Sequence, residues 1–275
     1  MKLPDYFEPG PLLGQGGMGF VYRVRDARTG CFLALKVLRS EFLSDAEFIV
    51  RLKREAEIAH RIRIEGVARV LEFQVDSPPL FLAYEYVDGD SLANLLHTEN
   101  FRQAEWVVHF YSKLLTAAAG LHSSGIVHRD LSPLNVLVRR MNGNPVIIDM
   151  GISRDLERSA ITAPDELLGT PEFCAPERIR GEPDSPSADL YAVGLLIYIG
   201  LSGANPFVRD HPTKTLMAQV EWDPPPITSL RLDLPEGWDV FLSRALDKDP
   251  VHRYPDAARM IEALQELDFR RESRP

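Results

Sequence analysis

Three side chains in the middle of the chain are of types that can organise a reaction around a metal ion and a hydroxyl group. Asp130 carries a carboxylate that can orient a hydroxyl, and Asn135 follows five residues later with an amide that can hold a metal. Asp149, fourteen residues after Asn135, adds a second carboxylate. Mg²⁺ prefers oxygen ligands and shares its coordination with phosphates, so side chains of these types would suit a magnesium ion that acts on phosphate groups.

A glycine-rich segment near the N-terminus is a candidate phosphate cradle: Gly14-Gln15-Gly16-Gly17-Met18-Gly19-Phe20-Val21. Glycines let main-chain N–H groups approach phosphate oxygens without a side chain in the way. A dinucleotide-binding turn or a flexible hairpin would have a similar composition. A dinucleotide fingerprint opens a helix, however, whereas the residues after this segment alternate as a strand does.

Lys36 follows that segment within the apolar pattern Ala34-Leu35-Lys36-Val37. A lysine in such a strand usually extends its ammonium into solvent. If the ammonium is buried, it needs a partner, and a phosphate together with a carboxylate would supply one. Glu55 and Glu57 are the candidate carboxylates, and only one of them can face the interior, since residues two apart on a helix point to different faces.

The first third of the chain has the alternation and turn signals of a small β structure. Helical spacing interrupts it over residues 45–63, where Phe48, Leu52 and Ile58 occupy apolar positions. A short polar link at residues 87–90 marks the boundary to the rest of the chain. We therefore predict a lobe of residues 1–86 and a lobe of residues 87–275, with strands in the first over residues 12–25, 32–38, 67–75 and 80–86.

The second lobe is predicted to be mainly helical. Two short strands are expected around the turn at residues 141–144. Residues 151–176 lack strong periodicity and are expected to form a long loop, which is often a sign of function. Helices are predicted over residues 91–96, 105–123, 188–201, 238–246 and 257–267.

Composition excludes several classes of protein. A net charge of −9 argues against a general nucleic-acid binder, which needs a basic face. No apolar run reaches the roughly 18 residues of a membrane span, and Leu190–Leu201 is expected to be a buried helix. The N-terminus lacks the pattern of a signal peptide. The two cysteines, Cys31 and Cys174, lack metal-ligand spacing, so we expect no disulfide framework and a cytoplasmic location.

The motifs and their order resemble those of the eukaryotic-like protein kinases, most closely the bacterial Ser/Thr protein kinases. The resemblance extends over nearly the whole chain and implies an α+β, bilobal protein-kinase fold. Its N-lobe is small and antiparallel β with one main helix, and its C-lobe is larger and mainly helical. The motifs are the glycine-rich segment, Lys36, His128-Arg129-Asp130-Leu131 with Asn135, Asp149-Met150-Gly151, and Thr170 to Glu177.

The resemblance implies transfer of the γ-phosphoryl group of ATP to protein hydroxyls. Asp130 would orient the hydroxyl, while Asn135 and Asp149 would hold Mg²⁺, with Mn²⁺ as an alternative metal. Lys36 would position the phosphates and pair with Glu55, which the family pattern selects over Glu57. Tyrosine kinases usually carry proline where Thr170 stands, so serine and threonine are the expected acceptors.

The same resemblance implies the nucleotide site. Tyr84-Glu85-Tyr86-Val87 is similar to the hinge that binds adenine through its main chain, with Tyr84 at the back of the pocket. Val21, Ala34 and Leu137 would enclose the base. The expected nucleotide-binding residues are Leu13, Gly14, Gln15, Gly16, Gly17, Met18, Gly19, Val21, Ala34, Lys36, Tyr84, Glu85, Val87 and Leu137.

Other positions match structural parts of the family or depart from it. Glu177 would pair with Arg253, Asp189 would brace the catalytic loop, and His128 would be a packed residue and not a ligand or base. Ser132 replaces the usual lysine, which removes a charge near the transferred group, and Met150 replaces a phenylalanine.

Two other functions remain as alternatives: a nucleotide-binding pseudokinase and a small-molecule kinase of related fold. The intact catalytic residues argue against the first, and the glycine-rich segment and Ala-Pro-Glu sequence against the second. The expected partners are protein substrates, with other copies of this chain among the candidates, and no nucleic acid. The basic tail at residues 270–275 would suit a linker to a regulatory or sensor domain beyond residue 275.

Phosphorylation of the loop at residues 151–176 is a prediction of the sequence. Arg129 precedes the catalytic Asp130, so a phosphate of about −1.5 to −2 charge can pair with it and order the loop. Thr162 is the first candidate for phosphorylation and Ser159 the second, whereas Thr170 is expected to have a structural role. We expect mass spectrometry of active protein to find phosphate on Thr162 or Ser159. Full activity with both unmodified would mean that these hydroxyls are only solvated loop groups.

Overall fold

The computed structural model describes residues 3–149 and 171–272. These residues form two compact units. The first consists of the described residues up to Asp88 together with Asp149, and the second of Gly89–Ile148 and the described residues from Pro171 onward. The sequence placed the boundary between residues 86 and 87. We refer to the two units as the first and the second lobe.

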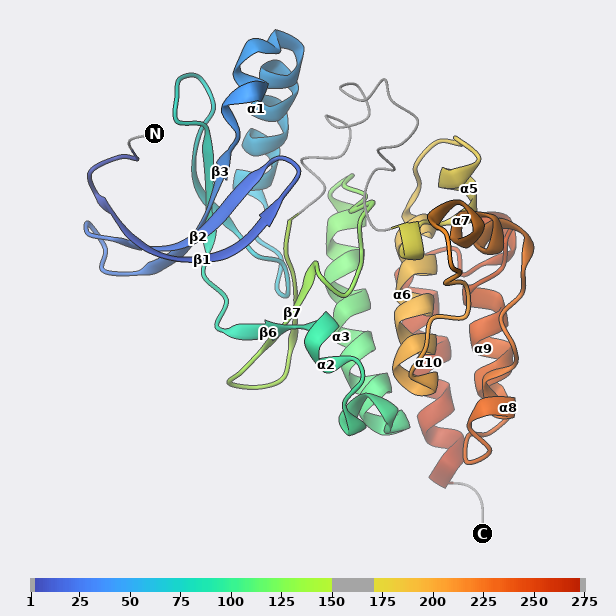
Figure 1. The fold of residues 1–275 in the computed structure, drawn as a ribbon. Helices are drawn as coiled ribbons and strands as arrows, with labels where there is room; N and C mark the ends of the chain where they lie inside the picture. Colours follow the sequence, from blue (N-terminus) through green and yellow to red (C-terminus); the bar gives the residue numbers. More distant parts are fainter. Residues whose placement is uncertain (1–2, 150–170, 273–275) are drawn as a thin grey trace. The chain divides into compact units, whose positions relative to one another are not determined.

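The first lobe is an antiparallel sheet of five strands with one main helix (Figure 1). The strand order is β1-β2-β3-β5-β4, and α1 (Ala46–Arg61) packs against β4. Asp45 caps α1, since its carboxylate accepts from Phe48 N at 2.9 Å. The strands are β1 (Phe7–Gly16), β2 (Gly19–Asp26), β3 (Phe32–Leu38), β4 (Val70–Gln74) and β5 (Phe81–Glu85).

Alternation gives this sheet two different faces. Side chains that are neighbours across a strand pair, or two apart on one strand, point to the same side. One side carries the apolar cluster formed by Phe7, Val24, Leu33, Leu35, Val37, Phe81 and Ala83. The positions between these residues, Lys36 and Ala34 among them, therefore lie on the opposite face of β3.

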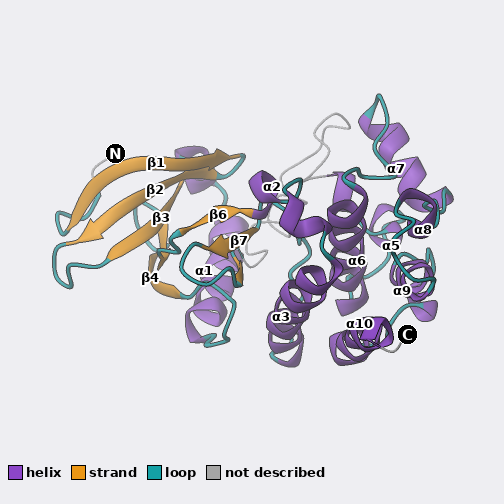
Figure 2. Cartoon of the chain, turned by 90° about the horizontal axis from the view of Figure 1, so that it is seen from below, coloured by secondary structure: helices purple, strands orange, loops and turns teal. Residues whose placement is uncertain are grey.

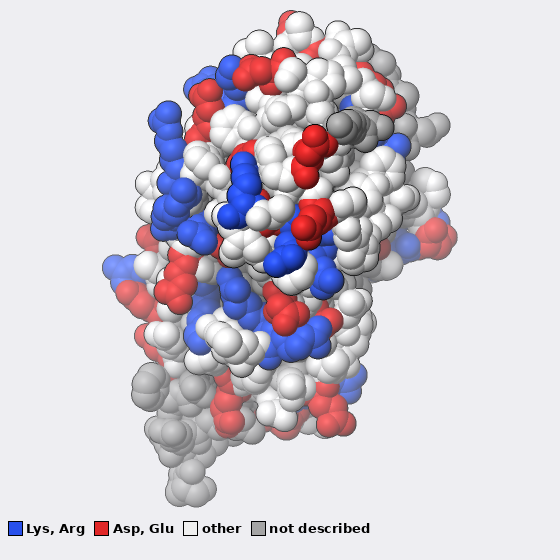
Figure 3. Space-filling view, turned by 90° about the vertical axis from the view of Figure 1, so that its left-hand side faces the viewer, with Lys and Arg blue, Asp and Glu red and all other residues white. Residues whose placement is uncertain are grey.

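Several charged side chains of the first lobe contact opposite charges. Arg28 contacts Asp26 at 2.9 Å and also Glu72, which accepts from the Tyr6 hydroxyl. The hydrogen bonds that Asp26 accepts from the Arg28 side chain lower the pKa of this buried carboxyl group. On the face drawn in Figure 3, lysine and arginine side chains are likewise interspersed with aspartate and glutamate.

The second lobe is mainly helical (Figure 2). Its strands β6 (Gly89–Ser91), β7 (Val136–Arg139) and β8 (Pro145–Ile147) form one small antiparallel sheet. The helices are α2 (Leu92–Leu95), α3 (Ala104–Ser123), α5 (Pro176–Ile179), α6 (Pro186–Ser202), α7 (Pro212–Glu221), α8 (Ile227–Leu230), α9 (Gly237–Ala245) and α10 (Ala257–Glu272).

Helix α6 is the centre of this lobe. Every residue from Ala188 to Leu201 is buried, and α3, α8 and α9 pack against the helix. The Tyr111 hydroxyl on α3 donates to Leu196 O at 3.0 Å and so ties the two helices together. The prediction that the apolar stretch 190–201 is a buried helix is therefore confirmed. Within the described residues, no helix combines the length and the apolar character that crossing a membrane requires.

The predicted α+β, bilobal fold is confirmed, and the differences concern short elements. The sequence did not predict α5, α7 or α8, and the polar link 87–90 overlaps the strand β6. Gly89-Asp90-Ser91 contains no apolar residue, so β6 has no alternation to detect; it forms because β7 pairs with it. Helix α5 spans only Pro176–Ile179, which is too short to show helical spacing.

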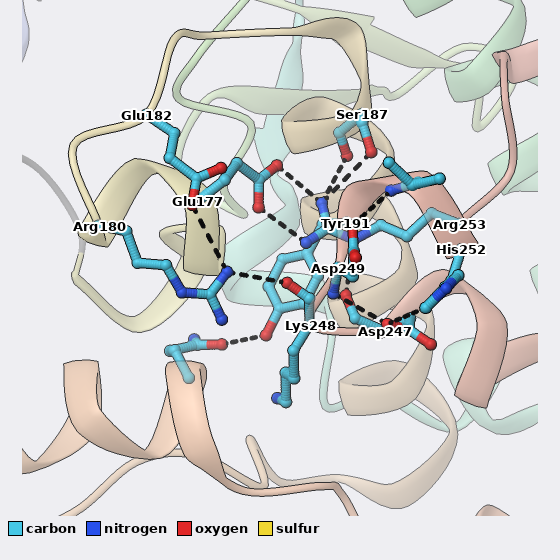
Figure 4. Close-up of polar contacts among 12 residues, drawn as sticks. Glu177, Arg180, Glu182, Ser187, Tyr191, Asp247, Lys248, Asp249, His252 and Arg253 are labelled. Carbon is cyan, nitrogen blue, oxygen red and sulfur yellow. Dashed lines mark hydrogen bonds and ion pairs between the residues drawn. The ribbon is translucent and has the colours of Figure 1, made fainter.

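A buried ion pair joins α5 to the segment after α9 (Figure 4). Arg253 contacts both carboxylate oxygens of Glu177, at 2.8 and 2.7 Å, and also donates to Asp247 O and Ser187 O. Its guanidinium lies 4.8 Å from the ring centroid of Tyr191. Two parallel bonds in a site without solvent fix both position and direction, so the pair anchors α5 on the helical core.

We expect Glu177→Gln to destabilise the protein by about 3–5 kcal/mol, because the substitution leaves the Arg253 charge buried without its counter-charge. Urea unfolding followed by circular dichroism measures the change. Glu182→Gln is the matched control, since the Glu182 carboxylate is 47% exposed and lies 3.8 Å from Arg180. That control should lose less than about 1 kcal/mol. Equal losses in the two variants would show that the buried pair is not an anchor.

Candidate active site

The predicted nucleotide residues of the first lobe share one face of its sheet. Val21 on β2 lies opposite Lys36 on β3, and Ala34 on β3 lies opposite Tyr84 on β5. Lys36 and Ala34 are two apart, so all four side chains point away from the apolar cluster on the other face. The strand register thus brings together four residues that the sequence separates by up to 63 positions.

Lys36 is held by a carboxylate. Its Nζ lies 2.7 Å from Asp149 Oδ2, and only 12% of the lysine side chain is exposed. Asp149 has a left-handed main chain, with φ of 58°, which is uncommon for a residue other than glycine. Such a conformation costs about 1–3 kcal/mol and is concentrated at functional sites. The expected pairing of Lys36 with Glu55 stays a prediction.

Helix α1 presents its two candidate glutamates differently. Glu57 is exposed, whereas Glu55 is partly buried and its Oε2 atom is shielded from solvent. The charge of Glu55 also acts on the hydroxyl of Tyr84 in the sheet. These observations support the choice of Glu55 over Glu57 as the residue that faces the interior of the lobe.

The glycine-rich segment is the end of the β1–β2 hairpin, where Gly16 lies opposite Gly19. A Cβ atom on Gly14 or Gly16 would meet nothing within 4 Å, so their main chain borders open space that a ligand can fill. Gly19 has a different reason to be glycine, because a Cβ there would lie 2.1 Å from Val37 O on β3. Met18 is buried, and its carbonyl oxygen accepts from Arg39 N at 2.9 Å.

The hinge segment keeps hydrogen-bonding groups of its main chain available. Glu85 N donates to Arg69 O, and its carboxylate accepts from Arg69 Nε at 2.8 Å, so the start of the hinge is fixed to the sheet. Val87 is buried, yet its main-chain N–H and C=O pair with none of the residues that the structure describes. A buried main-chain N–H or C=O group without a protein partner can form a hydrogen bond with the edge of a nucleotide base.

Tyr84 lies at the start of the hinge segment, on the sheet face that carries Ala34 and Lys36. Its side chain is buried, and none of the described residues accepts a hydrogen bond from its hydroxyl. Burial raises the pKa of this hydroxyl well above its usual value of 10, and the charges of Asp149 and Glu55 raise it further. The hydroxyl therefore stays protonated and can donate to a ligand or to water.

In the second lobe, the catalytic-loop residues Asp130 and Asn135 are in contact. Asn135 Nδ2 donates to both Asp130 O and Asp130 Oδ2, each at 2.9 Å. Asn135 O accepts from Ile148 N at 2.9 Å, which fixes the loop to the residue before Asp149. Because the amide nitrogen binds Asp130, the amide oxygen Oδ1 is the atom of Asn135 that can hold a cation.

His128 is a packed residue, as predicted. It is fully buried, its Nε2 lies 3.1 Å from Ile148 O, and its Nδ1 lies 3.2 Å from Asp130 N. The neutral ring with the proton on Nε2 satisfies both contacts, since Nδ1 then accepts from the Asp130 amide. His128 thus supports the loop and has no nitrogen free for a metal. Ser132 is also fully buried, a position that would not suit the lysine usual there.

The donor atoms on these elements fit the metal that the motif implies. Asp149 supplies a carboxylate and Asn135 an amide oxygen, which are the hard oxygen ligands that Mg²⁺ prefers. The Asp149 side chain is 35% exposed, so it remains accessible beside Lys36. Within the described residues no group of three or more acidic, histidine or cysteine side chains gathers as a metal cage.

Several predicted residues lie outside the described ranges: Met150, Gly151, Ser159, Thr162 and Thr170. Leu137 is on β7 of the second lobe, opposite Ser91 on β6. The contact of Arg129 with a phosphate stays a prediction. In the described structure the side chain of Arg129 lies beside Asp184, at 3.2 Å.

Sequence reasoning missed Asp184 and Arg178, which adjoin the catalytic loop. Arg178 Nε donates to Asp184 Oδ1 at 2.8 Å, and Arg178 Nη1 donates to Arg129 O. Arg178 follows the family's Ala-Pro-Glu sequence directly, which is the only signal that could have found it. Asp184, in a loop rich in polar residues, has no such signal.

A two-lobed α+β fold with these motifs is the architecture of protein kinases, and comparisons with known proteins agree. Residues 7–265 match the protein kinase domain family. The chain is 34% identical over 270 residues to the serine/threonine-protein kinase pkn3 of Myxococcus xanthus, covering 94% of this chain and 49% of pkn3. It is 33% identical to the serine/threonine-protein kinase PknB of Mycobacterium tuberculosis, covering 94% of this chain and 42% of PknB.

The crystal structure of the PknI kinase domain of Mycobacterium tuberculosis is also similar. It has a TM-score of 0.74 at 26% identity, with 96% of each chain covered. The chain therefore belongs to the protein kinase domain family, as its resemblance predicted. It spans about half the length of the curated relatives that it matches.

The position of Tyr84 leads to a prediction about ligand size. We expect Tyr84→Gly to bind purine-enlarged ATP analogues at least tenfold more tightly than wild type, because it removes the bulky ring behind the hinge. The cavity should also cost on the order of 3 kcal/mol of stability. Tyr22→Gly is the control, since Tyr22 packs against the apolar cluster on the opposite face of the sheet. Calorimetry measures affinity, and equal affinities of wild type and Tyr84→Gly would refute the prediction.

Proposed function

We propose that this chain is an ATP- and Mg²⁺-dependent protein serine/threonine kinase domain, which transfers the γ-phosphoryl group of ATP to Ser and Thr hydroxyls of proteins. The hydrogen bond from Asn135 Nδ2 to Asp130 Oδ2, at 2.9 Å, carries this proposal. It holds the Asp130 carboxylate in one orientation. In-line transfer to a hydroxyl requires such an orientation, whereas nucleotide binding alone does not.

Lys36 binds the phosphate groups of ATP. Asp149 holds the ammonium at 2.7 Å, so the cation is already placed before the nucleotide arrives. The main chain at Gly14 and Gly16, which borders open space, donates to the same phosphates. Asp149 and Asn135 would hold Mg²⁺ through their oxygen atoms, and the ion would neutralise charge on the phosphates. Mn²⁺ has the same ligand preference and is an alternative.

Asp130 orients the acceptor hydroxyl and takes its proton as the phosphoryl group transfers. The adenine ring binds to main-chain groups of Val87 and Glu85 and packs against Val21, Ala34 and Leu137. This assignment is supported by the shared sheet face of Val21 and Ala34 and by the available main chain of Val87.

The substrate class and partners rest on the relatives. Both pkn3 and PknB are named serine/threonine-protein kinases, which supports protein Ser and Thr hydroxyls as acceptors, including those of other copies of this chain. The greater length of the relatives supports a further domain in the whole protein, and we propose a regulatory or sensor domain beyond residue 275. We also propose a cytoplasmic location for this domain, which its two free cysteines suit.

We expect Asp130→Asn and Lys36→Met each to lower kcat for phosphorylation of a generic protein substrate by about 100-fold or more. Asp130→Asn should still bind ATP, since it removes only the group that orients the hydroxyl. Labelled ATP with Mg²⁺ measures transfer, and circular dichroism checks folding. A small-molecule kinase would leave the protein substrate unlabelled, and a pseudokinase would label nothing.

Asp210→Asn and Lys214→Met are the matched controls. Lys214 on α7 and Asp210, which precedes α7, form an exposed ion pair at 2.9 Å, and each control repeats one of the test substitutions. Both controls should keep wild-type turnover. Near-normal turnover of Asp130→Asn would rule out the proposed mechanism.

A further inference from the structure

A buried carboxylate lies between two arginines beside the catalytic loop. The Asp184 side chain, on the loop between α5 and α6, is 9% exposed. Its Oδ1 accepts from Arg178 Nε at 2.8 Å, and its Oδ2 lies 3.2 Å from Arg129 Nε. Both oxygens of one carboxylate are therefore used, one by each guanidinium.

Arg129 is held at its main chain as well as at its side chain. Its N–H donates to Asp189 Oδ1 at 2.8 Å, and its carbonyl oxygen accepts from Arg178 Nη1. The residue has a left-handed main chain, with φ of 67°. Such a conformation persists in a residue other than glycine only where its surroundings impose it. Asp189, Arg178 and Asp184 are those surroundings.

The conformation of Arg129 determines the direction of the next residue, which is Asp130. A change in φ or ψ at Arg129 would swing the Asp130 carboxylate away from Asn135. Two guanidinium groups this close would repel each other without a negative charge between them. The carboxylate of Asp184 supplies that charge, and burial makes each of its contacts stronger than the same contact in water.

We propose that Arg178 and Asp184 are positioning residues for the catalytic loop, and that Asp184 is a built-in counter-charge for Arg129. The left-handed conformation of Arg129, and with it the orientation of Asp130, then requires no phosphate on the loop at residues 151–176. The catalytic consequence rests on the proposed kinase function, whereas the positioning itself does not.

The place of these residues in the chain makes them a rigid support. Arg178 follows Glu177 on α5, and Glu177 is fixed by Arg253. Asp184 lies five residues before Asp189 on the buried helix α6. Because Arg178 and Asp184 both contact Arg129, they hold that residue in a fixed position relative to α5 and α6.

This inference and the phosphorylation hypothesis predict different results. If a phosphate supplies the counter-charge, phosphatase treatment of wild type should lower kcat strongly. If Asp184 supplies it, treated wild type should keep kcat within about twofold. A loss above tenfold on treatment would overturn the inference.

The closing experiment combines hydrogen exchange with kinetics. Asp184→Asn keeps the size of the side chain but removes its charge, and we expect the amides of residues 128–135 to exchange at least tenfold faster in this variant. kcat should fall at least tenfold while KM for ATP stays within twofold, since the first-lobe residues are unchanged. Asp184→Glu should recover part of kcat. Asp210→Asn is the control for loss of a carboxylate and should change neither quantity.

The exchange measurement separates the two proposals. Unchanged exchange of residues 128–135 in folded Asp184→Asn would overturn the positioning role, whatever the activity. If wild type transfers no phosphate, the kinase proposal fails, and exchange still decides the role of Asp184. If Asp184→Asn does not fold, Arg178→Lys replaces it, since lysine keeps the charge but cannot contact Asp184 and Arg129 O together. Arg178→Lys should show the same faster exchange, and wild-type exchange in it would overturn the inference.

Discussion

The buried carboxylate of Asp189 is the interaction on which the catalytic part of the second lobe depends. It accepts from His122 Nε2, His128 N and Arg129 N, each at 2.8 Å. A carboxylate in an apolar helix would be strongly unfavourable without such donors. Two of these bonds, from His128 N and Arg129 N, fix the main chain just before Asp130. Through these bonds the buried helix α6 restricts the position of Asp130, whose carboxylate must be oriented.

In the first lobe, the corresponding constraint is the alternation of the sheet. A single set of strands has to bury one face and present a cation on the other. The apolar cluster takes Leu33, Leu35 and Val37 from β3, which leaves Ala34 and Lys36 for the opposite face. The strand register therefore decides which face of the sheet carries the Lys36 side chain, and the contact with Asp149 fixes the direction of its ammonium group. A shift of one residue would exchange the two faces and destroy the core and the site together.

The sequence predicted the parts of the site that stand in family motifs, and these include two distant contacts, Glu177 with Arg253 and Asp189 with the catalytic loop. It missed the distant contacts that no motif implies. Asp130, Asn135 and Lys36 stand in motifs, and the turn, strand and helix patterns around them are local. Asp149 as a partner of Lys36 was not predicted, and neither was Asp184 as a partner of Arg129. Residues 129 and 184 are 55 positions apart, and no periodicity links them. The left-handed conformations of Arg129 and Asp149 also have no composition signal, since neither residue is glycine.

One short stretch of the chain explains why the site can be both strained and well ordered. Between residues 177 and 189 the chain supplies Glu177, Arg178, Asp184 and Asp189, and each makes a buried polar contact. The first and last are fixed to the helical core, by Arg253 and by α6 itself, and the middle two contact Arg129. The unfavourable conformation at Arg129 is thus offset by contacts whose positions are set elsewhere. Because the support comes from the core, the loop before Asp130 can keep one conformation.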